Sequence, residues 1–347
     1  MGGIAHCCAP AGYAQLWRLL TMAKLCWHIH TCLPKKRLHA ITTWKTGWAL
    51  IVMCVLALYY IYQSHMPPEK DVFTIRFFFS GGIGNELFWY ASGLAIASRN
   101  HMAFHLEKDL KIRKFFNLTE AVFVDGPEYG SRFAQVKERQ CCCYNPSLAR
   151  PRESPVRYEA YLQSWKYFVD YRQVVREQFR PNADLLRRAR RVLDDALATL
   201  DGGDPAVGGH RTLVGVHVRR GDMLHQENMS LGFQVADARY LRAAIAYFAR
   251  RHRGCTFVVC SDDMAWTRRQ LEGAANVVFV SAGSAILDFI VLTLTNHTVM
   301  TTGTFSWWVA YLTGGDAVYY NQSSRPGSEL AHQVCTREYY LPNWVPL

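Results

Sequence analysis

An alternation of strand-like and helix-like segments most constrains how this chain can fold. From Leu213 onward, short runs rich in β-branched and aromatic residues are separated by apolar or amphipathic segments of helical length. A similar unit stands earlier, where VFTIRFFF (residues 72–79) is followed by the glycine-containing SGGIGN and then by the helix-like ELFWYASGLAIASR (residues 86–99). Such alternation is typical of βαβ units, so we predict an α/β protein with parallel sheets.

The pattern divides into two Rossmann-like halves that would face a cleft. A long amphipathic helix is predicted over 183–200, and GGDPAVGG at 202–209 has the composition of a linker. We therefore expect an N-terminal domain over 71–204 and a C-terminal domain over 205–347.

An apolar run precedes both halves. Residues 46–62, TGWALIVMCVLALYYIY, contain no charge and end in tyrosines, which is typical of a transmembrane helix at the short end of the usual range. Because basic residues precede the run, residues 1–45 are predicted to be a cytosolic tail, and 63–70 a short stalk. The rest of the chain would then face the lumen or the exterior.

The charge distribution argues against nucleic acid as a partner. The formal net charge is +11, but six of the 39 Lys and Arg residues and none of the 28 acidic residues lie in residues 1–68. The remainder is only mildly basic and has no Lys/Arg cluster interleaved with aromatic residues.

Sequons and cysteines agree with an extracytoplasmic location of the folded part. All four N-x-S/T sequons follow the apolar run, at Asn117, Asn228, Asn296 and Asn321. Six of the eleven cysteines also follow it, an even number that permits disulfides without indicating their connectivity. The CCC triplet at 141–143 fits no zinc-binding spacing, and Cys255 and Cys260 are expected to be buried thiols of a strand.

The segment HVRRGD, residues 217–222, closes a predicted strand with two adjacent arginines. Ligands of open α/β sheets gather at the carboxyl ends of strands, and a guanidinium can engage two oxygens of a diphosphate. The alternative is a structural Arg–Asp pair at the sheet edge.

Two glycine turns also run from a strand into a helix. SGGIGNE at 80–86 offers backbone N–H groups for a phosphate, although a tight turn capped by Asn85 explains it equally well. TTGTFSWWVAYL at 301–312 places the hydroxyls of Thr304 and Ser306 at a helix start. Trp307 and Trp308 are expected to pack in the core.

These motifs together resemble the galactoside alpha-1,2-fucosyltransferase family. The resemblance spans about residues 72–344 and rests on GGIGNELFWYAS, AYLQSWKYF, VGVHVRRGDM, SDDMAW, NHTVMTTGTFSWWVAYLTGGD and LPNWV, in that order. It implies a GT-B-type glycosyltransferase, a single-pass type II Golgi membrane protein with a lumenal catalytic domain. In such an enzyme the N-terminal domain (71–204) would be on the acceptor side and the C-terminal domain (205–347) would bind the donor. It further implies transfer of L-fucose from GDP-β-L-fucose to the 2-hydroxyl of a terminal β-galactoside on a glycan, with inversion.

The resemblance also implies roles for individual residues. Arg219 and Arg220 would bind the donor diphosphate, and Asp288 the guanine. The other residues implied at the donor site are Gly84, Asn85, His217, Thr304 and Phe305. The chain departs from the family pattern at Glu86, where a Gln is usual, so a direct donor role for this position is in doubt.

Inverting transfer must neutralise charge on the departing diphosphate. The chain has no Asp-x-Asp, the motif with which many nucleotide-sugar transferases hold a divalent metal, so we predict that the arginines replace the metal and that no cofactor is required. Arg220 is the predicted catalytic arginine. Asp222 and Glu227 are equal candidates for the general base, with His225 as a proton relay.

Two other functions remain open from the sequence. One is a lectin-like or scaffolding protein that keeps the fold without turnover, suggested by Glu86 and the short tail after Trp344. The other is fucose transfer to a different linkage, since the HVRRGD-type signature also resembles that of protein O-fucosylation enzymes.

Overall fold

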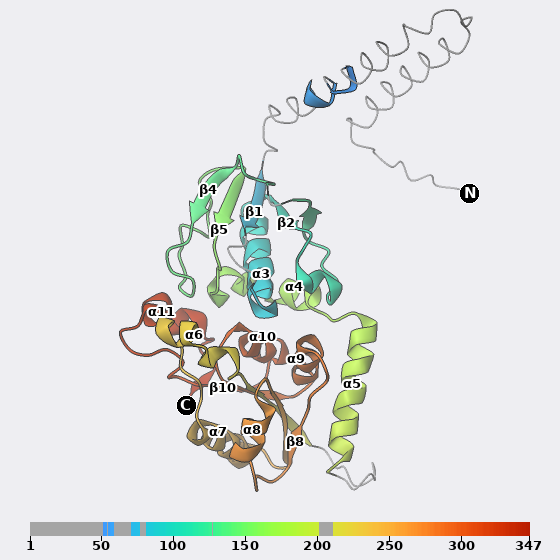
Figure 1. Ribbon diagram of the computed structural model, residues 1–347, viewed down its shortest axis with the longest axis vertical. Helices are drawn as coiled ribbons and strands as arrows, with labels where there is room; N and C mark the ends of the chain where they lie inside the picture. Colours follow the sequence, from blue (N-terminus) through green and yellow to red (C-terminus); the bar gives the residue numbers. More distant parts are fainter. Residues whose placement is uncertain (1–50, 54, 59–70, 77–80, 127, 201–210) are drawn as a thin grey trace, which may run out of the picture. The chain divides into compact units, whose positions relative to one another are not determined.

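The computed structural model describes residues 51–53, 55–58, 71–76, 81–126, 128–200 and 211–347 (Figure 1). The chain divides into two compact units, Met1–Pro67 and Pro68–Leu347. Of the first unit, residues 51–53 and 55–58 are helical and exposed. The predicted tail, most of the predicted anchor and the predicted stalk lie outside the described residues, as does the predicted linker at 202–209. The fold below is that of Pro68–Leu347.

The N-terminal half contains a five-stranded parallel sheet. Its strand order is β3-β2-β1-β5-β4, so the order reverses beside β1, where β1 pairs with both β2 and β5. The strands are β1 (Val72–Arg76), β2 (Ala103–Glu107), β3 (Val122–Val124), β4 (Ala134–Lys137) and β5 (Val156–Glu159).

The C-terminal half contains a six-stranded parallel sheet in the order β11-β10-β9-β6-β7-β8. Counted along the chain, this is the Rossmann order, with its reversal between β6 and β9. The strands are β6 (Thr212–Val218), β7 (Cys255–Ser261), β8 (Val277–Phe279), β9 (His297–Met300), β10 (Ala317–Tyr319) and β11 (Val345–Pro346). The predicted α/β fold with parallel sheets is confirmed.

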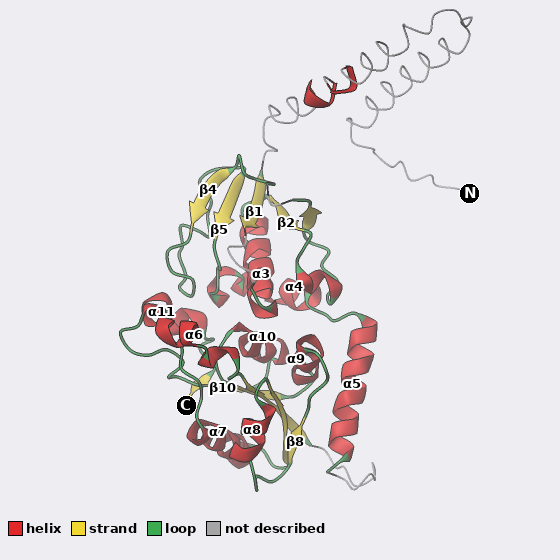
Figure 2. Ribbon diagram, viewed as in Figure 1, coloured by secondary structure: helices red, strands yellow, loops and turns green. Residues whose placement is uncertain are grey.

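Helices surround both sheets (Figure 2). In the N-terminal half these are α3 (Ile83–Arg99), η1 (Lys111–Lys114), η2 (Trp165–Tyr167), η3 (Val169–Tyr171), α4 (Arg172–Gln178) and α5 (Ala183–Ala198). In the C-terminal half they are η5 (Asp222–Leu224), α6 (Gln226–Leu231), α7 (Ala238–Arg251), α8 (Met264–Gln270), α9 (Ala285–Thr293), α10 (Thr304–Thr313), α11 (Glu329–Gln333) and α12 (Thr336–Tyr339).

Helix α3 joins the two halves. It packs on β1 and β2 of its own sheet and also against α10 of the other half. The helix predicted over 86–99 is confirmed, and it is buried on nearly all sides from Glu86 to Ala97. The reason is this second contact, in which Phe88 meets the rings of Trp307 and Trp308 at centroid distances of 4.6 and 4.9 Å.

Helix α5 follows the N-terminal sheet in the chain but packs on the C-terminal half. It lies beside α9 and β8, and its buried residues are Leu185, Ala189 and Leu193. Asn182 caps it by accepting a 2.9 Å hydrogen bond from the Leu185 N–H. The predicted boundary between residues 204 and 205 falls within 201–210, outside the described residues.

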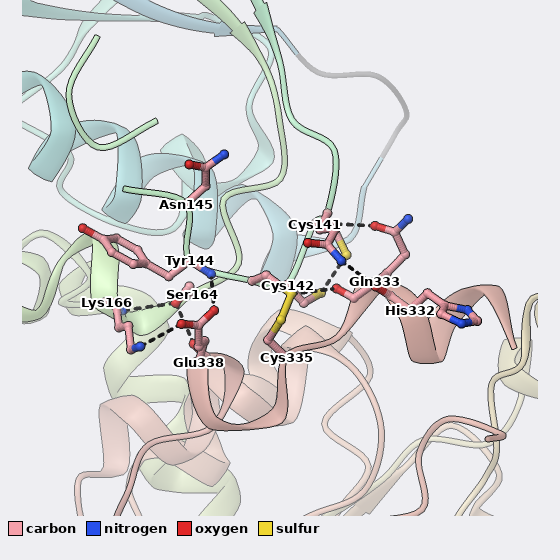
Figure 3. The surroundings of a disulfide bond; sticks show 12 residues. Cys141, Cys142, Tyr144, Asn145, Ser164, Lys166, His332, Gln333, Cys335 and Glu338 are labelled. Carbon is pink, nitrogen blue, oxygen red and sulfur yellow. Dashed lines mark hydrogen bonds and ion pairs between the residues drawn. A yellow bond between two sulfur atoms is a disulfide. The ribbon is translucent and has the colours of Figure 1, made fainter. Parts of the chain in front are cut away.

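A disulfide links the halves at a second point (Figure 3). Cys143 is bonded to Cys335, 192 residues further along the chain. Beside it, the Glu338 carboxylate accepts hydrogen bonds of 2.8 Å from both the Tyr144 N–H and Lys166 Nζ. Cys255 lies buried in β7 with a free thiol, as predicted, and so does Cys260.

Candidate functional site

A cavity of about 680 Å³ opens between the two halves at the carboxyl ends of β6 and β7. Its walls come from the starts of three helices and the ends of two strands. The lining residues include 82–85 at the start of α3, Lys111, His217 and Arg219 at the end of β6, 260–262 at the end of β7, and 283–285 and Thr304 at the starts of α9 and α10. The position beside the β6/β9 reversal is where open α/β sheets bind ligands. Most of the predicted donor residues come together here, namely Gly84, Asn85, His217, Arg219, Asp288, Thr304 and Phe305.

Three helices begin at this cavity without a side-chain cap. The N-cap residues of α3, α9 and α10 are Gly82, Ser284 and Gly303, and none makes a side-chain capping hydrogen bond. Elsewhere in the described chain, four α-helices are capped by Asn182, Asp237, Asp263 and Ser328, whereas the short helices α4, α6 and α12 have no side-chain cap. The first N–H groups of an uncapped helix, together with its dipole, favour an anion. The cavity therefore suits a negatively charged ligand.

Arg219 stands directly after β6, where its backbone is held by Thr301, the residue that follows β9. The Arg219 N–H donates a 3.0 Å hydrogen bond to Thr301 Oγ1. One edge of the guanidinium, Nε and Nη2, binds the two oxygens of Asp222 at 3.0 and 2.6 Å. Nη1 lies against Gly303, where a Cβ would force the guanidinium to shift, and the φ of 98° at this position also favours glycine.

Arg220 lies in a different environment from the one predicted. Its backbone N–H donates to Asp262 Oδ1 at 2.7 Å, and its Nε donates to Asp263 Oδ2 at 3.3 Å. The guanidinium carbon lies 4.0 Å from the ring centroid of Trp266. Arg220 does not line the cavity, and its carboxylate partner is Asp263 rather than Asp222.

Neither candidate base lines the cavity among the described residues. The hydrogen bonds from Arg219 lower the pKa of Asp222, which makes this carboxylate a weaker base. Glu227 lies exposed in the first turn of α6, and His225 directly precedes that helix. The structure brings Asp222 to Arg219 but brings neither Glu227 nor His225 to the cavity wall.

His217 and Phe305 form a stacked pair on the cavity wall, with ring centroids 4.3 Å apart. Burial, reinforced by the positive charge of Arg219, lowers the pKa of His217 to about 3. The imidazole is therefore neutral at physiological pH, and its Nδ1 is buried without a hydrogen-bond partner.

Asp288 reaches the cavity from the first turn of α9. Its Oδ1 accepts a 2.8 Å hydrogen bond from the Ala282 N–H. Burial raises the pKa of Asp288 above its usual value, and that hydrogen bond opposes the rise. A half-buried carboxylate in this position can accept N–H donors from a ligand.

The starts of α3 and α10 touch across the cavity floor. A Cβ on Gly84 would lie 2.6 Å from the Thr304 carbonyl carbon, so only glycine allows this approach. Asn85 Oδ1 accepts hydrogen bonds from Thr304 Oγ1 at 2.9 Å and from Gln163 Nε2 at 3.0 Å. Asn85 is thus not the N-cap considered from the sequence. That place belongs to Gly82, and Asn85 instead connects both halves.

Several residues of the site were not singled out from the sequence. Asp262 accepts the backbone N–H groups of Arg220 and Gly221 and lines the cavity. Its position after a predicted strand, in SDDMAW, was an available signal. Lys111 and Gln163 carried no such signal, because each reaches the site through contacts distant in sequence.

Glu86, the departure from the family pattern, is not among the cavity-lining residues. It is buried, and its Oε2 accepts a 3.0 Å hydrogen bond from the Ile112 N–H at the start of η1. Burial raises the pKa of Glu86, while hydrogen bonds from the backbone of η1 act in the opposite direction.

Two clusters of potential metal ligands occur in the described part of the chain. In the first, Cys143 and Cys335 are joined as a disulfide beside Glu338. The second, His252, His297 and Asp316, lies at the amino ends of the strands, away from the cavity.

No helix within the described residues is long and apolar enough to cross a membrane. Most of the run at 46–62 lies outside those residues. Three of the four sequons have an exposed asparagine in the structure, at Asn117, Asn296 and Asn321, whereas Asn228 is half-buried and donates from Nδ2 to the Asp222 carbonyl at 2.8 Å.

Comparison with known proteins identifies the chain as a glycosyltransferase. Residues 148–347 match the model of the family described as glycosyl transferase family 11. The galactoside alpha-(1,2)-fucosyltransferase 1 of Homo sapiens is 34% identical over 272 residues, which cover 77% of this chain and 73% of that protein. The Saimiri boliviensis boliviensis protein of the same name is 34% identical over 271 residues, 76% of this chain and 72% of that protein. The chain belongs to glycosyl transferase family 11.

Among solved structures, the chain is similar to two at low sequence identity. Fucosyltransferase NodZ from Bradyrhizobium is 15% identical, with a TM-score of 0.43 over 70% of this chain and 92% of that one. A structure of POFUT1 in complex with GDP is 10% identical, with a TM-score of 0.46 over 74% of this chain and 100% of that one.

Proposed function

We propose that this chain transfers L-fucose from GDP-β-L-fucose to the 2-hydroxyl of a terminal β-galactoside, with inversion to an α-1,2 linkage, on a GT-B-type scaffold. The names of its relatives support the reaction. The observation that carries the proposal is the cavity itself. Three uncapped helix starts and Arg219 meet at the strand-order reversal, an arrangement suited to the diphosphate of a nucleotide sugar.

The roles of the lining residues follow from their chemistry. Arg219 and the helix start at Thr304 would hold the diphosphate. Asp288 would accept the two N–H groups at the edge of guanine, because a carboxylate offers two acceptor oxygens. The stacked His217 and Phe305 would form a neutral wall for the sugar or the base. The start of α3, with Gly84 and Asn85, would close the site from the other half.

Transfer requires the acceptor oxygen to attack C1 of fucose as the bond from C1 to the diphosphate oxygen breaks. The transition state resembles an oxocarbenium ion, and one further negative charge develops on the departing GDP. Arg219 would stabilise that charge in place of a metal. Arg220 would support the site indirectly, by holding Asp263 and Trp266 beside it.

The general base would remove the proton of the attacking hydroxyl. Asp222 already binds Arg219 through both oxygens, so we propose that it orients this arginine. Glu227 forms no ion pair in the described part of the chain, which favours Glu227 as the base once an acceptor is bound.

The proposed function is tested with the purified full-length chain in detergent, in buffer containing EDTA. We expect transfer of label from GDP-fucose to a β-galactoside and none from GDP-mannose or UDP-galactose. Activity in EDTA is expected because arginine supplies the charge that a metal would otherwise supply. Binding of the glycan without turnover would favour a lectin-like protein. Activity that manganese or magnesium alone restores would contradict the metal-free mechanism.

We further propose a single-pass type II protein of the Golgi membrane, anchored in the bilayer by residues 46–62, with the catalytic unit in the lumen. Positive charge before the apolar run, the position of the four sequons and the Cys143–Cys335 disulfide support this topology.

Glycosidase treatment of the protein expressed in animal cells is expected to lower its apparent mass. We expect the exposed Asn117 and Asn321 to carry glycans, because neither side chain is engaged in a hydrogen bond in the described part of the chain. Peptide mapping after deglycosylation would identify the sites. An unchanged mass, with the C-terminal part open to protease in sealed vesicles, would reverse the topology.

A further inference from the structure

The charged side chains on the cavity wall are two cations and two carboxylates, Lys111, Arg219, Asp262 and Asp288. Arg219 pairs with Asp222 through one edge of its guanidinium, at 2.6 Å. Without Lys111, the lining side chains would be one cation and two carboxylates, and attraction of a diphosphate would depend on Arg219 and the three helix starts. Within the described residues, Lys111 is the cavity-lining cation that forms no salt bridge, although its charge opposes the effect of burial, which raises the pKa of the nearby Glu86.

Lys111 reaches the cavity from η1, in the half opposite Arg219. The Leu110 residue before η1 provides no side-chain cap, so the first N–H groups of η1 need another acceptor. Glu86 provides it from the first turn of α3, accepting the Ile112 N–H at 3.0 Å. Ile112 is itself fully buried, which fixes η1 against α3.

Glu86 also connects this anchor to the rest of the site. Gly84 and Asn85, immediately before it, line the cavity and contact Thr304. The first turn of α3 therefore places Gly84 and the Asn85 amide on the cavity wall. Through Glu86, the same turn also holds the backbone of η1, and with it Lys111, beside the cavity. A Lys side chain is a mobile point charge and can follow a phosphate as the leaving group departs.

We propose that Lys111 is a donor-binding residue, whose ammonium contacts the diphosphate from the side opposite Arg219, and that Glu86 is the positioning residue that holds Lys111 there. This inference rests on the proposed function, because it takes GDP-fucose as the ligand. In this role the carboxylate of Glu86 holds η1 and does not contact the negatively charged donor.

The test measures GDP affinity by calorimetry and kcat/KM for GDP-fucose, on the full-length chain. Lys111→Gln removes the charge and is expected to weaken GDP binding about tenfold at low salt, with a smaller difference at high salt because exposed charges are screened. Lys111→Arg should retain most of the affinity. Lys114→Gln is the matched control, since Lys114 lies in the same helix but not on the cavity wall, and it should behave as wild type.

Glu86→Gln and Glu86→Leu test the positioning role. We expect each to weaken GDP binding, Glu86→Leu more strongly, and the double variant with Lys111→Gln to be no weaker than the worse single variant. The positioning role of Glu86 would be overturned if the losses of GDP affinity from the Glu86 and Lys111 substitutions were additive. It would also be overturned if the Glu86 variants had a lower thermal midpoint but unchanged GDP affinity. Unchanged GDP affinity and kcat/KM in Lys111→Gln would overturn the inference about Lys111. The proposed function would still stand if the wild-type protein transfers fucose. Absence of GDP binding by the wild type would instead defeat the proposed function.

Discussion

Arg219→Lys is expected to lower the turnover of fucose transfer about a hundredfold, on the order of 3 kcal/mol of transition-state stabilisation. The guanidinium has two tasks in the structure. Its Nε and Nη2 bind Asp222, while Nη1 lies against Gly303 at the start of α10. A lysine ammonium can pair with Asp222 but cannot also present a second N–H edge to the ligand. Steady-state kinetics with GDP-fucose measures the effect.

Arg220→Lys is the matched control, because it makes the same substitution one residue along. We expect a modest loss of stability from the weaker contact with Trp266 and turnover within a few-fold of wild type. Thermal unfolding checks that both variants are folded. The reverse order of effects, with Arg220→Lys inactive and Arg219→Lys nearly normal, would restore the predicted role of Arg220.

Removing the Cys143–Cys335 disulfide is expected to lower the free energy of unfolding by about 2–5 kcal/mol. The bond closes a long stretch of chain, with 192 residues of separation, and holds the α12 region against the N-terminal half. Cys143→Ala combined with Cys335→Ala leaves no odd thiol, and thermal unfolding should show a midpoint lower by several degrees.

Cys141→Ser is the control for that substitution, because its thiol is free and lies close by. It should leave the midpoint nearly unchanged. Two results together would contradict the cross-link. The double variant would be as stable as the wild type, and Cys335 of the unreduced wild type would react with an alkylating reagent.

The alternation of segments predicted most of the fold because strand and helix periodicities are local properties. Asp237, for example, is a typical N-cap residue directly before an amphipathic segment, and it accepts the Tyr240 N–H at 2.8 Å. Strand β4 was not predicted from the sequence. Its residues alternate between half-buried and exposed at the edge of the sheet, so AQVK lacks the apolar character of a central strand.

The site was predictable where a residue's place follows from its strand or helix. His217 and Thr304 directly adjoin strand ends or helix starts, and the topology brings both to the cavity. The sequence does not show which of two adjacent arginines faces the cavity. The Arg220 side chain is held away from it by contacts with Asp263 and Trp266, more than 40 residues further along the chain. Lys111 reaches the cavity only through the buried contact of Glu86 with η1, which no local pattern indicates.

The linkage of the reaction product tests the central claim most directly. The purified full-length chain would be incubated with GDP-β-L-fucose and a β-galactoside, and the product analysed by nuclear magnetic resonance. We predict an α-anomeric fucose joined to the 2-hydroxyl of galactose. A β-anomeric product, a fucose on another hydroxyl, or release of free fucose and GDP without any glycan product would contradict the account.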